Sequence, residues 1–200
     1  MLHYGLIGKS LKHSFSKDYF TSKFEKAHIN ANYSLCELGN IEEIKDVFSK
    51  QWQGLNVTIP YKEQIIPFLN EVDDLATQVG AVNTIQLSKQ EGQTWLKGFN
   101  TDVIGFETTL KPLLQTHHTR ALVLGTGGAS KAVTYVLTQL NIPYVYVSRE
   151  AGLNKLGYEE LTPEIISTHT LIINTTPLGM FPDLESYPEI PYNAIGEKHL

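Results

Sequence analysis

The sequence has a single cysteine, Cys36, among its 200 residues. One thiol can form neither a disulfide within the chain nor a Cys-rich metal site, which excludes a disulfide-bonded secreted domain and a zinc module. No apolar run approaches the roughly 20 residues that a helix needs to cross a bilayer. The opening stretch, MLHYGLIGKS, lacks the basic and apolar parts of a secretory signal. We therefore expect a protein of the reducing cytoplasm with no membrane segment.

Charge is also scarce in this sequence. Charged residues make up 18% of it, and 16 Lys and Arg stand against 21 Asp and Glu, for a net charge of −5. An acidic chain lacks the basic surface that nucleic acid requires, so nucleic acid is not expected as a partner. Hydrophobic residues reach 42%, which suits a folded core and not a disordered chain. The length allows one large domain or two small ones.

Short apolar runs alternate along the chain with segments whose apolar residues recur every three to four positions. The runs predict strands, and the periodic segments predict amphipathic helices. The predicted strands are 3–8, 32–38, 54–60, 81–87, 94–99, 121–124, 143–148 and 171–175. The predicted helices are 17–28, 41–50, 61–69, 72–79, 103–114 and 131–140. This alternation is typical of an α/β fold with mostly parallel sheets.

The alternation restarts near residues 101–103, where we expect a domain boundary with 103–114 as the connecting helix. The prediction is an N-terminal α/β domain over 1–101, with a mostly parallel sheet, and a C-terminal Rossmann-like domain over 102–200. Residues 197–200 carry no stop signal and resemble the entry into another strand. We therefore expect the last part of the C-terminal domain to be missing, the chain being a fragment of a longer protein.

A glycine-rich loop, Gly125-Thr126-Gly127-Gly128-Ala129-Ser130, directly follows the predicted strand 121–124 and precedes a predicted helix. At this place Gly125 permits a tight turn, Gly127 allows the backbone to approach a pyrophosphate, and the helix offers free N–H groups. Ser130 replaces the third glycine of the usual pattern. The loop therefore predicts dinucleotide binding, and a glycine-rich turn that binds nothing is the alternative.

The end of the next predicted strand discriminates between cofactors. An NAD site usually has Asp or Glu there, about 20 residues past the glycines, to bind the ribose 2′-hydroxyl. Here Ser148 and Arg149 stand at that place, and the planar, charged guanidinium of Arg149 suits a 2′-phosphate. This favours NADP over NAD. Because Glu150 follows and would repel a phosphate, NAD stays an alternative, as does a solvated surface role for Arg149.

Polar residues interrupt the first half of the chain where α/β sheets place ligands. Ser14 and Ser16 lie in the loop after the first predicted strand and suit a carboxylate or a polyol, although Ser16 also suits the N-cap of the next helix. Asn56 and Asn83 stand within apolar runs, where a buried amide must be hydrogen-bonded. Several such residues at one edge of one sheet indicate a binding site.

Lys62 and Asp102 suggest a reaction. A carbonyl that accepts hydride develops negative charge on its oxygen, and a neighbouring ammonium such as that of Lys62 stabilises the charge and delivers a proton. A carboxylate such as that of Asp102 would orient the ammonium and bind a substrate hydroxyl, and the proton affinities of the pair would be coupled. Taken singly, Lys62 also suits a solvated helix cation and Asp102 an N-cap.

Together these motifs resemble the shikimate dehydrogenase family. The matching stretches follow the family's order: HSFS (13–16), NVTIPYK (56–62), GAVNT (80–84), GFNTD (98–102), GTGGAS (125–130), SR (148–149) and INTTPLGM (173–180). The resemblance implies reversible, NADP-dependent reduction of 3-dehydroshikimate to shikimate on the route to chorismate and the aromatic amino acids.

The resemblance also implies roles for single residues. The catalytic pair would be Lys62 and Asp102. The substrate's carboxylate and hydroxyls would be bound by Ser14, Ser16, Thr58, Asn83 and Asp102. The cofactor would be bound by Gly125, Thr126, Gly127, Gly128, Ala129 and Ser130 at the pyrophosphate and by Ser148 and Arg149 at the 2′-phosphate. No metal is implied.

The chain departs from the family's pattern in three respects. Lys17 stands where the family usually has Pro, and Ser148-Arg149-Glu150 stands where it usually has Asn-Arg-Thr. The family also continues past residue 200 with a strand bearing a Tyr, a glycine contact to the nicotinamide and a helix bearing a substrate-binding Gln. We therefore expect the chain by itself to be impaired or inactive.

Two other functions stay open. One is a quinate or broader polyol-acid dehydrogenase that uses NAD, and the other is a non-catalytic ligand-binding module, which the presence of both Lys62 and Asp102 disfavours. The sequence does not determine the oligomeric state, and a homodimer is compatible with it. Five histidines show no metal-ligand spacing and are interpreted as loop or surface residues: His13, His117, His118, His169 and His199.

Overall fold

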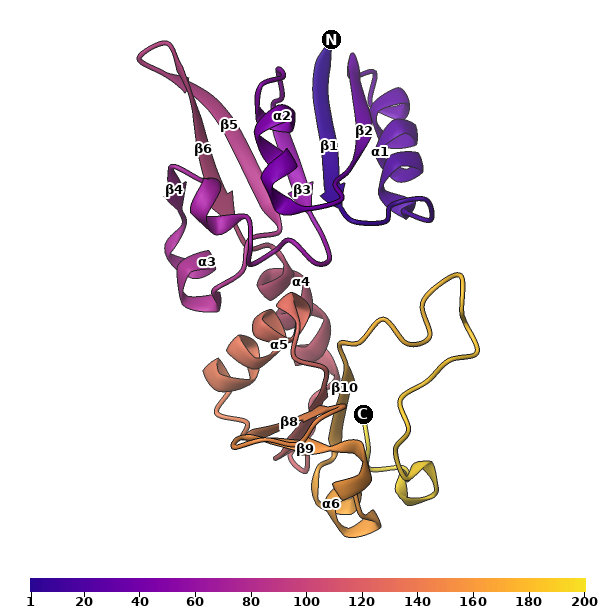
Figure 1. The fold of residues 1–200 in the computed structure, drawn as a ribbon. Helices are drawn as coiled ribbons and strands as arrows, with labels where there is room; N and C mark the ends of the chain where they lie inside the picture. The colour runs from indigo at the N-terminus through magenta and orange to yellow at the C-terminus, as the bar shows by residue number, and fades with distance from the viewer. The chain divides into compact units, whose positions relative to one another are not determined.

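The computed structural model describes all residues from 1 to 200, and the chain forms two compact units, Met1–Thr101 and Asp102–Leu200. Each unit is a β-sheet with helices packed on its faces (Figure 1), so the predicted α/β class is confirmed. No helix of the chain is long and apolar enough to cross a membrane.

The N-terminal unit contains a six-stranded sheet in the order β2-β1-β3-β5-β6-β4. Its strands are β1 (Leu2–Gly8), β2 (Ala31–Glu37), β3 (Gly54–Val57), β4 (Glu71–Val72), β5 (Thr84–Gln90) and β6 (Gln93–Phe99). The strands β2, β1 and β3 are parallel, whereas β5 runs antiparallel to both β3 and β6. The antiparallel part arises from the polar turn at Glu91 and Gly92, where both residues have positive φ (50° and 81°). A two-residue turn of this kind joins only antiparallel neighbours.

The helices of this unit divide between the two faces of the sheet (Figure 1). On one face α1 (Phe15–Lys26) packs its aromatic side chains on Leu6 and Tyr33. On the other face lie α2 (Ile44–Phe48), α3 (Asp74–Val79) and the short 3₁₀ helices η1 (Ile41–Glu43) and η2 (Ile66–Phe68), packed against Ile7. Adjacent residues of β1 therefore serve opposite cores, as the alternation of side chains along a strand requires.

Some of the predicted helices of this unit are shorter than expected. The predicted helix 61–69 is a series of turns that ends in η2, and the predicted helix 72–79 begins two residues later, at Asp74, because Glu71 and Val72 pair with β6. The alternative in which Ser16 caps the first helix was wrong. The N-cap is Ser14, whose hydroxyl accepts the backbone N–H of Ser16.

The C-terminal unit contains a four-stranded, wholly parallel sheet in the order β10-β7-β8-β9. Its strands are β7 (Ala121–Leu124), β8 (Tyr144–Ser148), β9 (Lys155–Gly157) and β10 (Leu171–Asn174). The chain moves outward from β7 to β8 and β9 and then returns to the other side of β7 for β10. The neighbouring ends of β7 and β10 therefore form a topological switch point, which is where open α/β sheets bind ligands.

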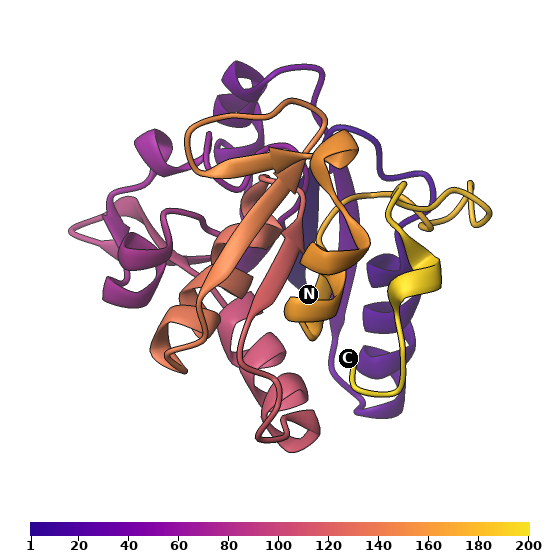
Figure 2. The same ribbon diagram turned by 90° about the horizontal axis from the view of Figure 1, so that it is seen from below.

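Helices cover both faces of this sheet. On one side α4 (Asp102–Leu110), which continues into η3 (Lys111–Leu113), contacts α5 (Gly128–Gln139). On the other side α6 (Pro163–Thr168) packs on Leu122 and Leu124, together with η4 (Tyr158–Glu160) and η5 (Tyr192–Ala194). Figures 1 and 2 show α6 and the segment from 175 to 200 on the side of the sheet away from α5.

The last residue of the chain lies against the edge of β10. The backbone N–H of Leu200 donates to the Thr170 carbonyl (2.9 Å), and the N–H of Ile172 donates to the Leu200 carbonyl (2.9 Å). These are the two hydrogen bonds that one residue of a neighbouring parallel strand makes.

Candidate functional site

The polar segments of the N-terminal unit meet at one edge of its sheet. Thr58, just past β3, donates its backbone N–H to the Ile7 carbonyl of β1 (2.8 Å). The N–H of Val57 donates to the Asn83 carbonyl (2.9 Å), and the N–H of Asn83 donates to the Phe99 carbonyl at the end of β6 (3.0 Å). The ends of β1, β3 and β6 and the start of β5 therefore lie side by side. The predicted substrate residues Thr58 and Asn83 belong to this edge.

The Asn83 side chain makes several hydrogen bonds at this edge and is only 9% exposed. Its Oδ1 accepts the backbone N–H of Thr101 (2.8 Å) and the hydroxyl of Thr84 (3.1 Å), while its Nδ2 donates to the Thr101 hydroxyl (2.9 Å). These bonds join the residue before β5 to the segment after β6. They meet the requirement that a buried amide be hydrogen-bonded.

Asn100 lies next to this cluster and is only 3% exposed. Its Nδ2 donates to the Ala81 carbonyl (2.9 Å). This bond ties the end of β6 to the segment between α3 and β5, where Gly80 ends α3 in the left-handed conformation. The Asn100 side chain therefore bonds to a backbone carbonyl of the segment that precedes β5.

Lys62 and Asp102 belong to different units of the chain. Lys62 is half-buried in the turn after β3, and its backbone carbonyl accepts the N–H of Val82 (2.7 Å). Asp102 is the first residue of α4 and directly follows Thr101, whose backbone N–H is held by Asn83. The meeting of the Lys62 ammonium with the Asp102 carboxylate stays a prediction.

The glycine loop connects β7 to α5 at the switch point of the C-terminal unit. Gly125 has φ +105°, and a Cβ added there would stand 2.8 Å from Thr175 Oγ1. Residues other than glycine rarely adopt this conformation. Gly127 is the N-cap of α5 with no side-chain cap bond, and nothing lies within 4 Å of the position of its would-be Cβ. The loop therefore combines a strained turn with an open helix N-terminus, whose N–H groups are available to an anion.

Two hydroxyls hold this loop in shape. Ser130 is 1% exposed, and both its backbone N–H (3.0 Å) and its hydroxyl (2.7 Å) donate to the Gly127 carbonyl. Thr175, at the end of β10, donates its hydroxyl to the Leu124 carbonyl (2.7 Å). The Ser130 hydroxyl is thus bonded within the loop, and its contact with a pyrophosphate stays a prediction. The role of Thr175 was not predicted, since it depends on β10 lying beside β7.

The end of β8 carries the residues predicted to select the cofactor. The Ser148 hydroxyl donates to the Glu150 carbonyl (2.6 Å), and Arg149 is exposed. Burial raises the pKa of Tyr158 in η4, and the nearby charge of Arg149 offsets part of that rise. The Arg149 charge is therefore near η4. The contact of its guanidinium with a 2′-phosphate stays a prediction.

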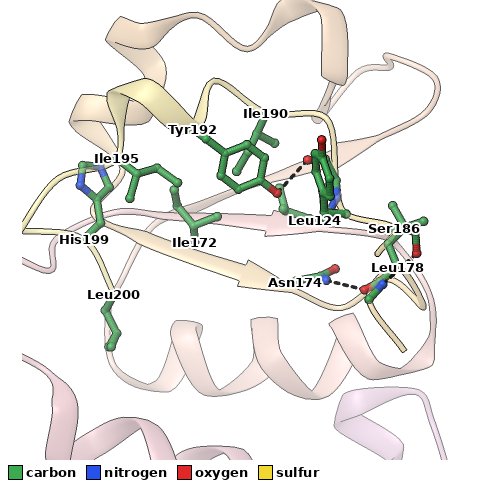
Figure 3. A pocket seen from close by; sticks show the side chains of 13 residues that line it. Leu124, Ile172, Asn174, Leu178, Ser186, Ile190, Tyr192, Ile195, His199 and Leu200 are labelled. Atoms are coloured by element: carbon green, nitrogen blue, oxygen red, sulfur yellow. Dashed lines mark hydrogen bonds between the residues drawn. The ribbon is translucent and has the colours of Figure 1, made fainter. Parts of the chain in front are cut away.

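A separate cavity of about 400 Å³ lies in the C-terminal unit between the sheet and the final segment (Figure 3). Its walls are largely apolar and include Leu124, Ile172 and Ile190. The Tyr192 hydroxyl donates to the Pro188 carbonyl (2.9 Å), and Asn174 Nδ2 donates to the Leu178 carbonyl (3.1 Å). None of the predicted cofactor residues lines this cavity.

Among the histidines interpreted as loop or surface residues, His118 does lie in a loop but is buried, being only 8% exposed. Its Nδ1 accepts the backbone N–H of Gln115 (2.9 Å). Burial lowers the pKa of His118, and the neighbouring His117 lowers it further. The apolar residues around position 118 do not form a periodic pattern, so no local signal in the sequence indicates this burial.

The C-terminal unit, with its switch point and open glycine turn, defines a class: it is a Rossmann-type dinucleotide-binding fold. The family model for the shikimate dehydrogenase substrate binding domain matches residues 6–85, within the N-terminal unit. A shikimate dehydrogenase (NADP(+)) of Clostridium beijerinckii is 40% identical over 202 residues, which cover 94% of this chain and 72% of that relative. The chain belongs to the shikimate dehydrogenase family, as its motifs indicated.

Solved structures agree with this assignment. The crystal structure of shikimate dehydrogenase from Aquifex aeolicus matches with a TM-score of 0.84 at 34% identity, over 100% of this chain and 77% of that one. The shikimate 5-dehydrogenase of Thermus thermophilus, in complex with NADP(H) and shikimate, matches with a TM-score of 0.79 at 27% identity, again over 100% of this chain and 77% of that one.

Proposed function

We propose that this protein is a shikimate dehydrogenase that catalyses the reversible, NADP-dependent reduction of 3-dehydroshikimate to shikimate. The observation that carries the proposal is the match of the whole chain to the Thermus thermophilus structure that holds NADP(H) and shikimate. The identity of 40% to a relative named shikimate dehydrogenase (NADP(+)) supports the same activity and cofactor.

In this proposal the two units bind different ligands. Residues 1–101 bind the substrate, which agrees with the match of residues 6–85 to the family's substrate binding domain. Residues 102–200 bind NADP at the glycine loop. The loop fits a dinucleotide because no side chain caps α5 and the space beyond Gly127 is open, so the backbone can approach a pyrophosphate closely.

Bound NADPH supplies the hydride that reduces the carbonyl carbon. As the C=O π electrons move onto oxygen, the ammonium of Lys62 stabilises the growing negative charge and donates a proton, leaving shikimate's hydroxyl and a neutral amine. The Asp102 carboxylate accepts a hydrogen bond from a substrate hydroxyl and orients the Lys62 ammonium. After the proton transfer, the neutral Lys62 amine takes up a proton from solvent. In the oxidation direction Lys62 takes the proton from the hydroxyl.

The remaining polar residues of the sheet edge would orient the substrate. Ser14 accepts the backbone N–H of Ser16 through its oxygen (3.2 Å), which leaves its proton available for the substrate carboxylate. Thr58 and Asn83 belong to the same edge, within reach of substrate hydroxyls. Such positioning lowers the entropic cost of bringing the carbonyl to the hydride donor.

Cofactor selectivity has a second candidate, NAD, which Glu150 favours. The Glu150 carboxylate disfavours a phosphate. Rates with NADP⁺ and NAD⁺, each with shikimate and with quinate, decide the matter: the proposal expects the highest kcat/KM for NADP⁺ with shikimate. A quinate dehydrogenase would prefer quinate, and an NAD⁺ enzyme would prefer NAD⁺.

The experiment that tests the function uses the chain extended past residue 200 by the strand and helix that the family carries there, called the wild type here, and compares it with Lys62→Ala. The wild type should reduce NADP⁺ with shikimate, followed by the absorbance of the NADPH that forms. Lys62→Ala should lose about 10²- to 10⁴-fold in kcat while still binding shikimate in calorimetry. A wild type that binds shikimate without turnover would instead indicate a non-catalytic module. The cytoplasmic location and a homodimer stay predictions, to be checked by fractionation and by sedimentation.

A further inference from the structure

Tyr33 occupies a buried place beside the predicted substrate site, although no motif includes it. It lies in β2, is 4% exposed, and stacks its ring on that of Phe20 from α1, with centroids 4.7 Å apart and planes 11° from parallel. Ser16 stands four residues before Phe20 and therefore on the same face of α1. The stacked pair therefore lies about one helical turn from Ser16.

The pKa of Tyr33 reflects its burial and its neighbour Ser16. Burial raises the pKa of Tyr33 to about 12, and a hydrogen bond with the Ser16 side chain offsets part of that rise. A phenol with this pKa is protonated at every physiological pH, so it acts as a fixed hydrogen-bonding group and not as an acid or base. Its role must therefore be sought in the other bonds that it makes.

The Tyr33 hydroxyl begins a chain of hydrogen bonds that crosses the sheet. It donates to Asn56 Oδ1 in β3 (2.8 Å), and Asn56 Nδ2 donates to Thr84 Oγ1 at the start of β5 (3.3 Å). The Thr84 hydroxyl donates in turn to Asn83 Oδ1 (3.1 Å). Each group donates in the same direction, which is the arrangement in which hydrogen bonds strengthen one another.

This chain leads to a residue that the proposed function places on the substrate. Tyr33, the neighbour of Ser16, stands at one end and Asn83 at the other, with Asn56 and Thr84 between them. Because Tyr33, Asn56 and Thr84 come from β2, β3 and β5, no single loop could keep the two ends in register. Positioned binding groups of this kind need supporting hydrogen bonds to keep their geometry.

We propose that Tyr33 is a positioning residue for the substrate site: through Asn56 and Thr84 it holds Asn83 in the orientation that binds shikimate. Tyr33 itself does not touch the substrate in this proposal. The inference rests on the proposed function and adds to it a positioning role for Tyr33, Asn56 and Thr84. Its consequence is that the hydroxyls of Tyr33 and Thr84 contribute to substrate affinity and not to the chemical step.

The test is Tyr33→Phe, which removes the hydroxyl and keeps the ring stacked on Phe20. Loss of one link in the chain should raise KM for shikimate about five- to tenfold, with kcat within about twofold and KM for NADP⁺ unchanged. Tyr146→Phe is the matched control. It removes a phenol bonded to Thr134 (3.0 Å) in the C-terminal unit, and should leave KM for shikimate unchanged.

A second pair of variants tests the other end of the chain. Thr84→Val removes the hydroxyl while keeping the shape of the side chain and should raise KM for shikimate in the same way, whereas Thr84→Ser keeps the hydroxyl and should restore it. The double variant Tyr33→Phe with Thr84→Val should lose less than the product of the two single losses, because both changes interrupt one chain of hydrogen bonds.

The outcomes separate the two proposals. A purely structural role for Tyr33 would lower the melting temperature of Tyr33→Phe without changing KM for shikimate, and that result would overturn the inference while leaving the function intact. A wild type that neither turns over nor binds shikimate would refute the proposed function, and the inference would fall with it.

Discussion

Alanine substitutions at two glycines of one loop should have opposite consequences. Gly125 and Gly127 are two residues apart in the turn between β7 and α5. At Gly125, φ is +105° and an added Cβ would stand 2.8 Å from Thr175 Oγ1 and 3.1 Å from Thr176 Cγ2. At Gly127, φ is −86° and an added Cβ would meet nothing within 4 Å. The first glycine is therefore required by the fold, and the second is not.

The cost of Gly125→Ala has two sources. A non-glycine residue in this backbone conformation costs about 1–3 kcal/mol. The new Cβ must also displace the Thr175 hydroxyl, and the hydrogen bond from that hydroxyl to the Leu124 carbonyl is worth about 1 kcal/mol. We therefore expect Gly125→Ala to lower the free energy of unfolding by about 2–4 kcal/mol, measured by urea titration with circular dichroism.

Gly127→Ala should leave the free energy of unfolding within about 0.5 kcal/mol of the wild type. It should nevertheless weaken NADP⁺ binding about tenfold or more, measured by calorimetry, because the added Cβ occupies the space through which a pyrophosphate approaches the backbone. A Gly125→Ala variant as stable as the wild type would refute the strained turn. A Gly127→Ala variant that binds NADP⁺ with unchanged affinity would refute the location of the cofactor.

Two further predictions concern buried polar groups. Asn100→Leu should lower the free energy of unfolding by about 1–3 kcal/mol in urea titration, because the Ala81 carbonyl loses the bond from Asn100 Nδ2; a smaller loss would mean that this bond does not support the site. Because burial lowers the pKa of His118, the unfolded chain binds its proton more readily. The stability that this residue contributes is complete above its unfolded pKa, about 6.5, and is lost as the pH falls through the folded pKa. Melting temperatures of the wild type should therefore fall more steeply on acidification than those of His118→Gln, and parallel profiles would contradict this.

The sequence predicted those parts of the fold that depend on local patterns. Four buried apolar residues before a glycine turn were enough to locate β7, with bounds of Ala121 and Leu124 as expected. By contrast β9, which spans Lys155–Gly157, was missed because three residues carry no periodicity. The start of α5 at Gly128 was also missed, because glycine, alanine and serine give no apolar pattern.

The sequence likewise indicated some residues of the candidate site and missed others. Thr58 and Asn83 were assigned to one sheet edge as members of a set of polar residues in apolar runs. They meet because β5 runs antiparallel to β3, which brings the start of β5 beside the end of β3, and the structure joins them through Val57. The link from Tyr33 to Asn56 joins residues on different strands, and it depends on the pairing of β1 with both β2 and β3. Residues whose importance arises from strand register in this way carry no signal in a single sequence.

The central claim is that Lys62 and Asp102 act together on the substrate, and a double-mutant cycle on kcat/KM for shikimate oxidation tests it most directly. Lys62→Ala and Asp102→Asn should each lower kcat/KM by about 10²-fold or more. The kcat/KM of the double variant should be no more than about tenfold below that of the less active single variant, because each partner depends on the other. Losses that multiply in full, or a Lys62→Ala variant with wild-type kcat/KM, would show that the two residues do not form a catalytic pair.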